Sequence, residues 1–206
     1  MQYPSKLVER AVEEMSKLPG IGKKTALRLV LHMLKEEKNF TFTLSEALED
    51  LVEKIKYCKK CRNISDDDLC MICSSHRRDA TTICVVEGHN DVLAIENTSQ
   101  YNGLYHVLGG LISPIAGVGP EDLNFDLLIK RINQEKIKEI ILALSTTMDG
   151  DTTAFYLSKR LGKMDVKVTS IARGIPIGGE LEFTDEITLG RSIMTRITYT
   201  QSTDNQ

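Results

Sequence analysis

The sequence predicts a multidomain protein of mixed α+β and α/β class, and three observations predict it. Apolar residues recur at helical spacing through residues 1–57, which indicates an N-terminal helical domain. Four cysteines gather within residues 58–80, a segment too polar to form a core of its own. Strand and helix patterns alternate through residues 81–172, which predicts an α/β domain with a mostly parallel sheet, followed by a C-terminal tail at 173–206.

Composition and charge limit the classes of function. No run of about 18 apolar residues exists to form a transmembrane helix, and residues 1–10 lack the apolar core of a secretory signal. We therefore expect a cytoplasmic protein with no membrane contact. The net charge is −3, but residues 1–80 carry a net +2 and residues 81–206 a net −5. Binding of an anionic partner must therefore depend on local basic clusters and backbone donors in the first part of the chain.

The N-terminal domain is predicted to contain three helices. The first ends at Pro19-Gly20, and the second is expected from Lys23 to Glu37. Thr43-Leu44-Ser45-Glu46 has the pattern of a capping box and is expected to start the third helix. The apolar residues expected to face inward are Leu7, Val8, Ala11, Val12 and Met15, then Ala26, Leu27, Val30, Leu31 and Leu34, then Ala47, Leu48, Leu51, Val52 and Ile55.

The turn Leu18-Pro19-Gly20-Ile21-Gly22 has the composition of a phosphate-binding site. Its glycines let the backbone approach a ligand closely, and the first amides of the next helix have no intrahelical acceptor. The positive end of the helix dipole lies there as well. We interpret the turn as a helix-hairpin-helix that holds the DNA backbone without reading bases; the alternative is an ordinary turn with solvated lysines. The expected DNA-binding residues are Gly20, Ile21, Gly22, Lys23, Lys24 and Arg28.

The cysteines of the second segment form two CxxC pairs, Cys58/Cys61 and Cys70/Cys73, separated by eight residues. Four thiolates at this spacing suit one tetrahedral Zn²⁺, which would supply the stability that the segment lacks. Redox-active cysteines are the alternative, as is replacement of one ligand by His76. Cys84 lies in an apolar strand pattern and is expected to be a buried thiol. The cations that flank the cysteines are expected either to contact phosphates or to pair with the acidic run 66–68. These cations are Lys59, Lys60, Arg62, Arg77 and Arg78.

The α/β domain is predicted to place acidic residues at the carboxyl ends of its strands. Strands are expected at 82–86, 104–108, 139–144 and 167–172, and helices at 91–96, 125–133, 153–161 and, in the tail, 185–196. Glu87 follows one strand, and Asp149 and Asp151 lie in the loop after another. If the three carboxylates converge, Mg²⁺ would relieve their repulsion. The alternative is helix capping by Asp151. No nucleophile in a catalytic context and no Walker A loop accompanies them.

The order of these parts resembles the RecR family. The resemblance covers almost the whole chain, from the helix-hairpin-helix and the four cysteines to the tail. The further matching motifs are Val86-Glu87-Gly88-His89-Asn90-Asp91-Val92-Leu93-Ala94, Tyr105-His106-Val107-Leu108-Gly109-Gly110, Gly117-Val118-Gly119-Pro120-Glu121-Asp122-Leu123 and Ala172-Arg173-Gly174-Ile175-Pro176-Ile177-Gly178-Gly179-Glu180-Leu181-Glu182-Phe183.

The resemblance implies a Toprim fold for residues 81–172 and a role as a DNA-bound recombination mediator rather than an enzyme. It implies a homotetrameric clamp near the nucleoid that works with RecO and RecF to load recombinase onto single-stranded DNA. Lys23 and Arg28 would line the DNA, and the acidic face would engage RecO. A Mg²⁺-dependent Toprim nuclease or strand-passage enzyme is the alternative. Asp149-Gly150-Asp151 lacks the glycine that follows this motif in catalytic Toprim enzymes, which weakens that alternative.

Overall fold

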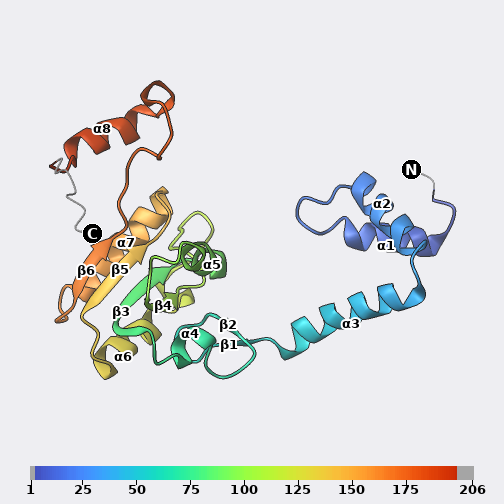
Figure 1. Ribbon diagram of the computed structural model, residues 1–206, viewed down its shortest axis with the longest axis horizontal. Coiled ribbons are helices and arrows are strands. Elements are labelled where there is room, and N and C mark those ends of the chain that lie inside the picture. The colour runs from blue at the N-terminus through green and yellow to red at the C-terminus, as the bar shows by residue number, and fades with distance from the viewer. Residues whose placement is uncertain (1–2, 199–206) are drawn as a thin grey trace, which may run out of the picture. The chain divides into compact units, whose positions relative to one another are not determined.

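The computed structural model describes residues 3–198, which divide into two compact units at Lys56/Tyr57 (Figure 1). The first unit is helical, and the second contains the cysteine-rich module, the α/β domain and the tail. Each unit has its own buried core. None of the helices among these residues is long and apolar enough to cross a membrane.

The first unit contains α1 (Lys6–Met15), α2 (Lys23–Met33) and α3 (Lys38–Lys54). The Ser5 hydroxyl caps α1 by accepting from the Leu7 amide at 3.1 Å. The small core of this unit lies between α1 and α2 and is formed by Val12, Ala26 and Val30. The three predicted helices are confirmed, although α2 ends at Met33, short of Glu37.

Two other predictions for this unit are wrong. The proposed capping box at residues 43–46 lies inside α3, which begins at Lys38 with Glu37 as its N-cap. The Ser45 hydroxyl contacts the Glu49 carboxylate of the next turn at 3.4 Å. The stripe of α3 was expected to face inward, but α3 has no buried residue. In α1 and α2 most of the predicted residues do pack in the core, and the exceptions are the exposed Leu7, Leu31 and Leu34. Exposed apolar side chains on the three helices are Leu7, Leu31, Leu34, Phe40, Phe42, Leu44, Leu48, Leu51 and Val52.

The cysteine-rich module is a compact segment with little regular structure. Two short strands, β1 (Lys56–Tyr57) and β2 (Ile64–Ser65), pair with each other, and α4 (Met71–Ser74) follows. Three of the four paired cysteines are buried and Cys73 is half-buried. The sulfurs themselves form the core of this module.

The α/β domain contains a four-stranded sheet in the order β4-β3-β5-β6. Its strands are β3 (Asp79–Val86), β4 (Gly103–Val107), β5 (Glu139–Ala143) and β6 (Lys167–Ser170). Every pairing is parallel, with Cys84 of β3 opposite both Tyr105 and Ile141. The predicted α/β class with a parallel sheet is confirmed.

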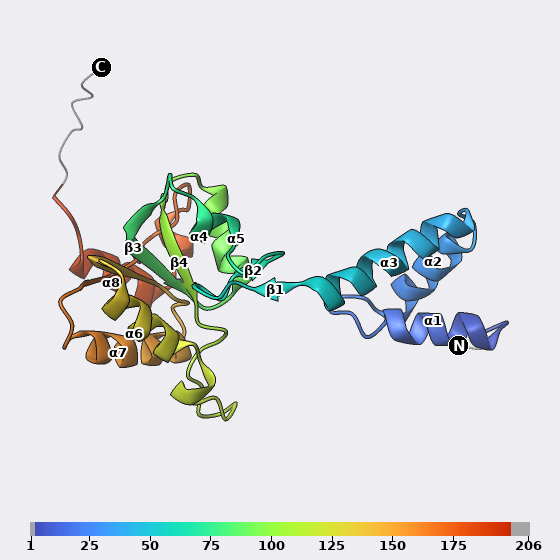
Figure 2. The same ribbon diagram turned by 90° about the horizontal axis from the view of Figure 1, so that it is seen from below.

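Helices cover both faces of this sheet, as the continuous burial along β4 and the second half of β3 requires. On one face, Ile83 and Val85 pack with α6 (Phe125–Gln134) and α7 (Met148–Leu161). On the other face, Cys84 and Val86 pack with Val92 of α5 (His89–Asn97). Figure 2 shows α5 on one side of the sheet and α6 and α7 on the other.

The cysteine-rich module closes the outer edge of β4. The Val107 amide donates to the Cys61 carbonyl at 2.8 Å. The module thus supplies an acceptor that a further strand would otherwise supply at this edge. Beside it, the buried Arg131 guanidinium donates from Nη1 to the Tyr105 carbonyl at 2.7 Å. Glu135 links Arg131, at 3.2 Å, to Lys60 of the module, at 3.1 Å. The module and the sheet are therefore joined by both backbone and charged contacts.

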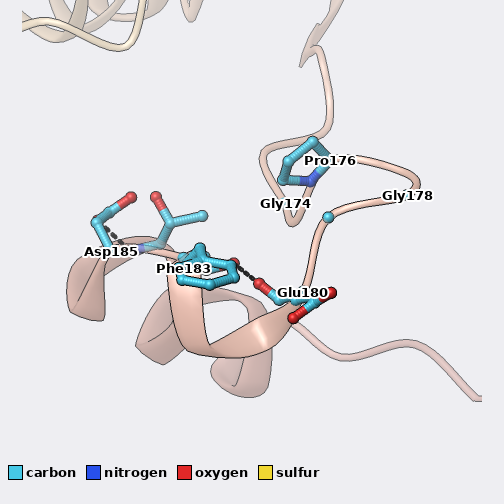
Figure 3. Close-up of a pocket in the computed structure, with 9 residues that line it drawn as sticks. Gly174, Pro176, Gly178, Glu180, Phe183 and Asp185 are labelled. Atoms are coloured by element: carbon cyan, nitrogen blue, oxygen red, sulfur yellow. Dashed lines mark hydrogen bonds between the residues drawn. The ribbon is translucent and has the colours of Figure 1, made fainter.

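The tail begins after β6 and contains a one-turn helix, η2 (Leu181–Phe183), and α8 (Glu186–Met194). The Asp185 carboxylate caps α8 by accepting from the Thr188 amide at 2.9 Å. Figure 3 shows the loop that carries Gly174, Pro176 and Gly178 on one side of a pocket, with Glu180, Phe183 and Asp185 on the other. No residue of α8 is buried, and Ile187, Ile193 and Met194 are exposed.

Candidate nucleic-acid interface and metal centre

The turn before α2 exposes a set of unused backbone donors. Gly20 has a φ of +78°, which favours glycine, and Gly22 is an extended N-cap without a side chain. Among residues 3–198, no acceptor contacts the amides of Lys23, Lys24 or Thr25. A side chain built on Gly22 would meet no atom within 4 Å, so the surface above the turn is open.

The charge around these amides is positive. The first turn of α2 has no acidic residue, whereas Lys23, Lys24 and Arg28 are all exposed. The N-terminus of α5 differs, because there the Asp91 carboxylate accepts from the Gly88 amide at 2.9 Å. The α2 terminus therefore combines unsatisfied donors, a positive dipole and free cations, which suits a phosphate oxygen.

The four cysteine sulfurs of the module lie within 4.8 Å of one another. Tetrahedral Zn–S bonds of about 2.3 Å place sulfurs about 3.8 Å apart, and the Cys61 and Cys70 sulfurs are 3.6 Å apart. The hydrogen bond between these two sulfurs, together with burial, raises the pKa of Cys61. A dication would favour the thiolates instead. The donor set and its geometry fit a structural zinc ion with four protein ligands and no open position.

Backbone hydrogen bonds hold the two CxxC turns in place. The Arg62 amide donates to the Cys58 carbonyl at 2.9 Å, and the Cys58 amide donates to the Asn63 carbonyl at 2.8 Å. In the second pair, the Cys73 amide donates to the Cys70 sulfur at 3.4 Å. His76 is not in the sulfur cluster, and Cys84 is a buried thiol of the sheet, whose pKa burial raises to about 12.

The acidic residues lie at the carboxyl ends of β3 and β5, but they do not form a three-carboxylate cluster. Among residues 3–198, the four cysteines are the one group of three or more candidate ligands within 4.8 Å of each other. Asp149 and Asp151 lie in the first turn of α7 rather than in a loop, and Thr147 caps that helix in place of Asp151. Asp151 pairs with Arg173 at 2.6 Å, and this hydrogen bond lowers its pKa. Burial, with Asp91 nearby, raises the pKa of Glu87.

Gly150 separates the two aspartates for a steric reason. A Cβ at this position would lie 2.0 Å from the Ser145 carbonyl oxygen, a backbone atom that cannot move aside. Helix propensity alone favours alanine by about 1 kcal/mol, but this clash is larger. We expect Gly150→Ala to lower the free energy of unfolding by about 3 kcal/mol, measured by urea denaturation.

The matched control for this substitution is Gly190→Ala in α8, where an added Cβ meets nothing within 4 Å. There we expect no loss of stability. Equal urea midpoints for the two variants would show that the contact between Gly150 and Ser145 does not exclude a side chain at position 150.

Several residues that position these sites carry no clear signal in the sequence. The buried Thr153 hydroxyl accepts from the Ile112 amide at 2.9 Å and donates to the Asp149 carbonyl at 2.7 Å. His106 is fully buried, and burial lowers its pKa to about 4. Of these residues, only Arg131 has a signal in the sequence, because Glu135 lies one helical turn away and predicts an ion pair.

Four family models match the chain in sequence order. They are described as RecR, helix-hairpin-helix, at residues 8–52; RecR, zinc finger domain of the four-cysteine type, at 55–75; Toprim domain, at 81–172; and RecR, C-terminal, at 174–197. The zinc-finger match spans all four clustered cysteines. Structural zinc is thus supported independently by the sulfur geometry and by the family.

Full-length relatives give the same result. The chain is 58% identical to Recombination protein RecR of Cytophaga hutchinsonii over 205 residues, which cover 99% of this chain and 100% of the relative. It is 57% identical to Recombination protein RecR of Phocaeicola vulgatus, with 97% of both chains covered. The protein of the same name from Porphyromonas gingivalis is 55% identical over 98% of this chain and 97% of its own length.

Proposed function

The chain belongs to the RecR family of recombination proteins, and from that premise we propose that it is a non-enzymatic DNA clamp that mediates recombinational repair. In this proposal, residues 1–57 bind the DNA backbone, 58–80 form the zinc module, 81–172 engage partner proteins and 173–206 join subunits. The protein acts in the cytoplasm at the nucleoid.

The observation that carries the proposal is the open N-terminus of α2. Three backbone amides without acceptors lie beside Lys23, Lys24 and Arg28, and nothing covers them among residues 3–198. Backbone donors and cations hold any phosphate equally well, so binding is indifferent to sequence. We propose Gly20, Ile21 and Gly22 as the turn that brings the duplex or single strand close to these amides.

One such site binds weakly, so the proposal requires several subunits acting together. Apolar surface left uncovered in a single chain supports self-association. On the first unit it includes the exposed apolar side chains of α3 and a groove whose lining includes Leu7, Met15 and Leu34. On the tail it includes Ile187 and Ile193. We propose a homotetramer in which these surfaces pair between copies.

For the acidic face we propose protein binding rather than metal binding. Glu87 and Asp149 are half-buried at the strand ends, and Asp151 is neutralised by Arg173. Among residues 3–198 the three carboxylates do not converge within 4.8 Å of one another, so they offer a Mg²⁺ ion no shared set of ligands. We propose RecO as the partner of this face and RecF as a second partner of the assembly, which together load recombinase onto single-stranded DNA.

Light scattering coupled to size exclusion, with and without an oligodeoxythymidine, tests the clamp. We expect a mass of several 23.1 kDa chains in both cases, raised by the mass of the DNA when DNA is present. A single-chain mass that never co-elutes with DNA at low ionic strength would contradict the proposal. If the protein elutes as a single chain and still binds DNA, the proposed DNA interface is retained and the proposed clamp is wrong.

A further inference from the structure

The cations that flank the cysteines differ in their freedom to meet a ligand. Lys59 pairs with Asp68 at 2.5 Å, Lys60 pairs with Glu135 at 3.1 Å, and Arg78 pairs with Glu96. Among the residues that the structure describes, neither Arg62 nor Arg77 forms an ion pair within 4.0 Å. Only Arg62 is also held in a defined position by a neighbouring ring.

Arg62 occupies a backbone position that favours glycine. Its φ is +64°, in the left-handed region, because the chain turns sharply after Cys61 to return its amide to Cys58. This turn directs the guanidinium over Tyr57, with Cζ 5.3 Å from the ring centroid. A strained position thus carries a cation that contacts an aromatic face.

Tyr57 also contacts a second ring. The His89 imidazole stacks on it with centroids 5.7 Å apart and an angle of 26° between the planes. Asn63 fixes that imidazole through a 3.3 Å contact between Asn63 Oδ1 and His89 Nδ1. Despite these contacts, 50% of Tyr57 remains exposed. Three planar groups, from the cysteine-rich module and the start of α5, therefore share one half-exposed surface.

We propose that Tyr57, Arg62 and His89 form a second DNA contact, which binds unpaired bases of single-stranded DNA by stacking. The inference rests on the proposed function, to which it adds a preference for one form of DNA. Flat rings bind any base face without reading its edge, and a guanidinium beside them contacts the adjoining phosphate or stacks as well. Bases within a duplex are already stacked on each other and are not available to such a surface.

Nearby acidic groups determine on which side of Tyr57 the phosphates of a bound DNA strand are expected to lie. Glu87 and Asp91 belong to the turn that precedes His89 and the first turn of α5, and Asp91 already accepts from the Gly88 amide at 2.9 Å. Their negative charge disfavours a phosphate at that helix end. The backbone of a bound strand is therefore expected on the Arg62 side of Tyr57, with the bases toward the rings.

Three variants test the site while keeping the fold. Tyr57→Ala removes the central ring, and Tyr57→Phe keeps it. Arg62→Gly removes the cation and suits the positive φ, so the substitution introduces no backbone strain in this turn. The matched control is Phe155→Ala, which removes a 60% exposed ring under Lys159 on α7, with Lys159 Nζ 4.7 Å from the ring centroid.

The probes are a labelled oligodeoxythymidine and a duplex of equal length, measured by fluorescence anisotropy on the full oligomeric protein. For Tyr57→Ala we expect roughly tenfold weaker binding of the single strand and unchanged binding of the duplex. Tyr57→Phe and Phe155→Ala should match the wild type on both probes. Arg62→Gly should weaken single-strand binding and lower its salt slope by roughly 0.7 for each phosphate that the guanidinium no longer neutralises.

Two outcomes separate this inference from the proposed function. If the wild type binds both probes but Tyr57→Ala and Phe155→Ala behave alike on the single strand, the stacking site is wrong and the clamp remains. If Tyr57→Ala weakens both probes equally, Tyr57 does not select unpaired bases and the inference is also wrong. If the wild type binds neither probe, both proposals fail.

Discussion

Replacing Lys23 and Arg28 together by glutamate is expected to weaken DNA binding by about two orders of magnitude, on single strands and duplexes alike. The amides at the start of α2 would remain, but two carboxylates would then repel the phosphate that they bind. In an oligomer the loss is repeated in every subunit, because each copy contributes the same contact. Anisotropy titrations with one labelled DNA at fixed salt measure the change.

The matched control is Lys6→Glu with Arg10→Glu, which alters the net charge by the same amount. These two side chains are exposed near the start of α1, away from the turn that precedes α2. We expect this variant to lose far less affinity. Equal losses in the two double variants would mean that overall charge, and not the α2 terminus, governs binding.

Replacing Cys61 by alanine is expected to abolish zinc binding and unfold the cysteine-rich module. The module has almost no core apart from its sulfurs, so the metal supplies most of its stability. Unfolding would also remove the Cys61 carbonyl from the Val107 amide and open the outer edge of β4. Hydrogen exchange should therefore become fast across residues 58–75 and at Val107, while the central strands β3 and β5 stay protected.

Cys84→Ala serves as the control, because it removes a cysteine that is buried in the sheet and outside the sulfur cluster. Elemental analysis should give one zinc per chain for the wild type and for Cys84→Ala, and none for Cys61→Ala. Zinc-free wild-type protein with a protected module would contradict this account of its stability.

The sequence predicted best where the signal and the structure are both local. The two CxxC pairs predict a four-sulfur cluster because each pair is a single turn, and the two turns lie close together in the sequence, within residues 58–73. The strands around Ile83 and Ile140 were equally clear, since continuous apolar runs are typical of a buried parallel sheet.

The apolar stripes of α1 and α2 were correctly predicted to form an internal core around Val12, Ala26 and Val30, whereas the stripe of α3 is not buried. Periodicity reports that a helix face is suited to burial, but not which chain covers it. Leu34 and Leu51, for example, belong to such faces but are exposed in the single chain. The capping pattern at residues 43–46 failed for a related reason, because a local pattern does not prevent a helix from running through it.

The acidic site was the least predictable part. Asp149 and Asp151 were predicted to lie in a loop, yet Gly150 between them is a helical glycine, and the Ser145 carbonyl that it packs against leaves no room for a side chain. Arg173, which pairs with Asp151, comes from a segment 22 residues away. Neither contact follows from periodicity or composition, because both depend on how β5, α7 and the segment after β6 meet in space.

The salt dependence of DNA binding tests the central claim most directly. If the amides and cations of α2 hold phosphates, log Kobs of the wild type falls linearly with log salt concentration, and the slope is smaller for the Lys23→Glu/Arg28→Glu variant. Binding that is insensitive to salt, or a slope shared by the wild type and this variant, would contradict it.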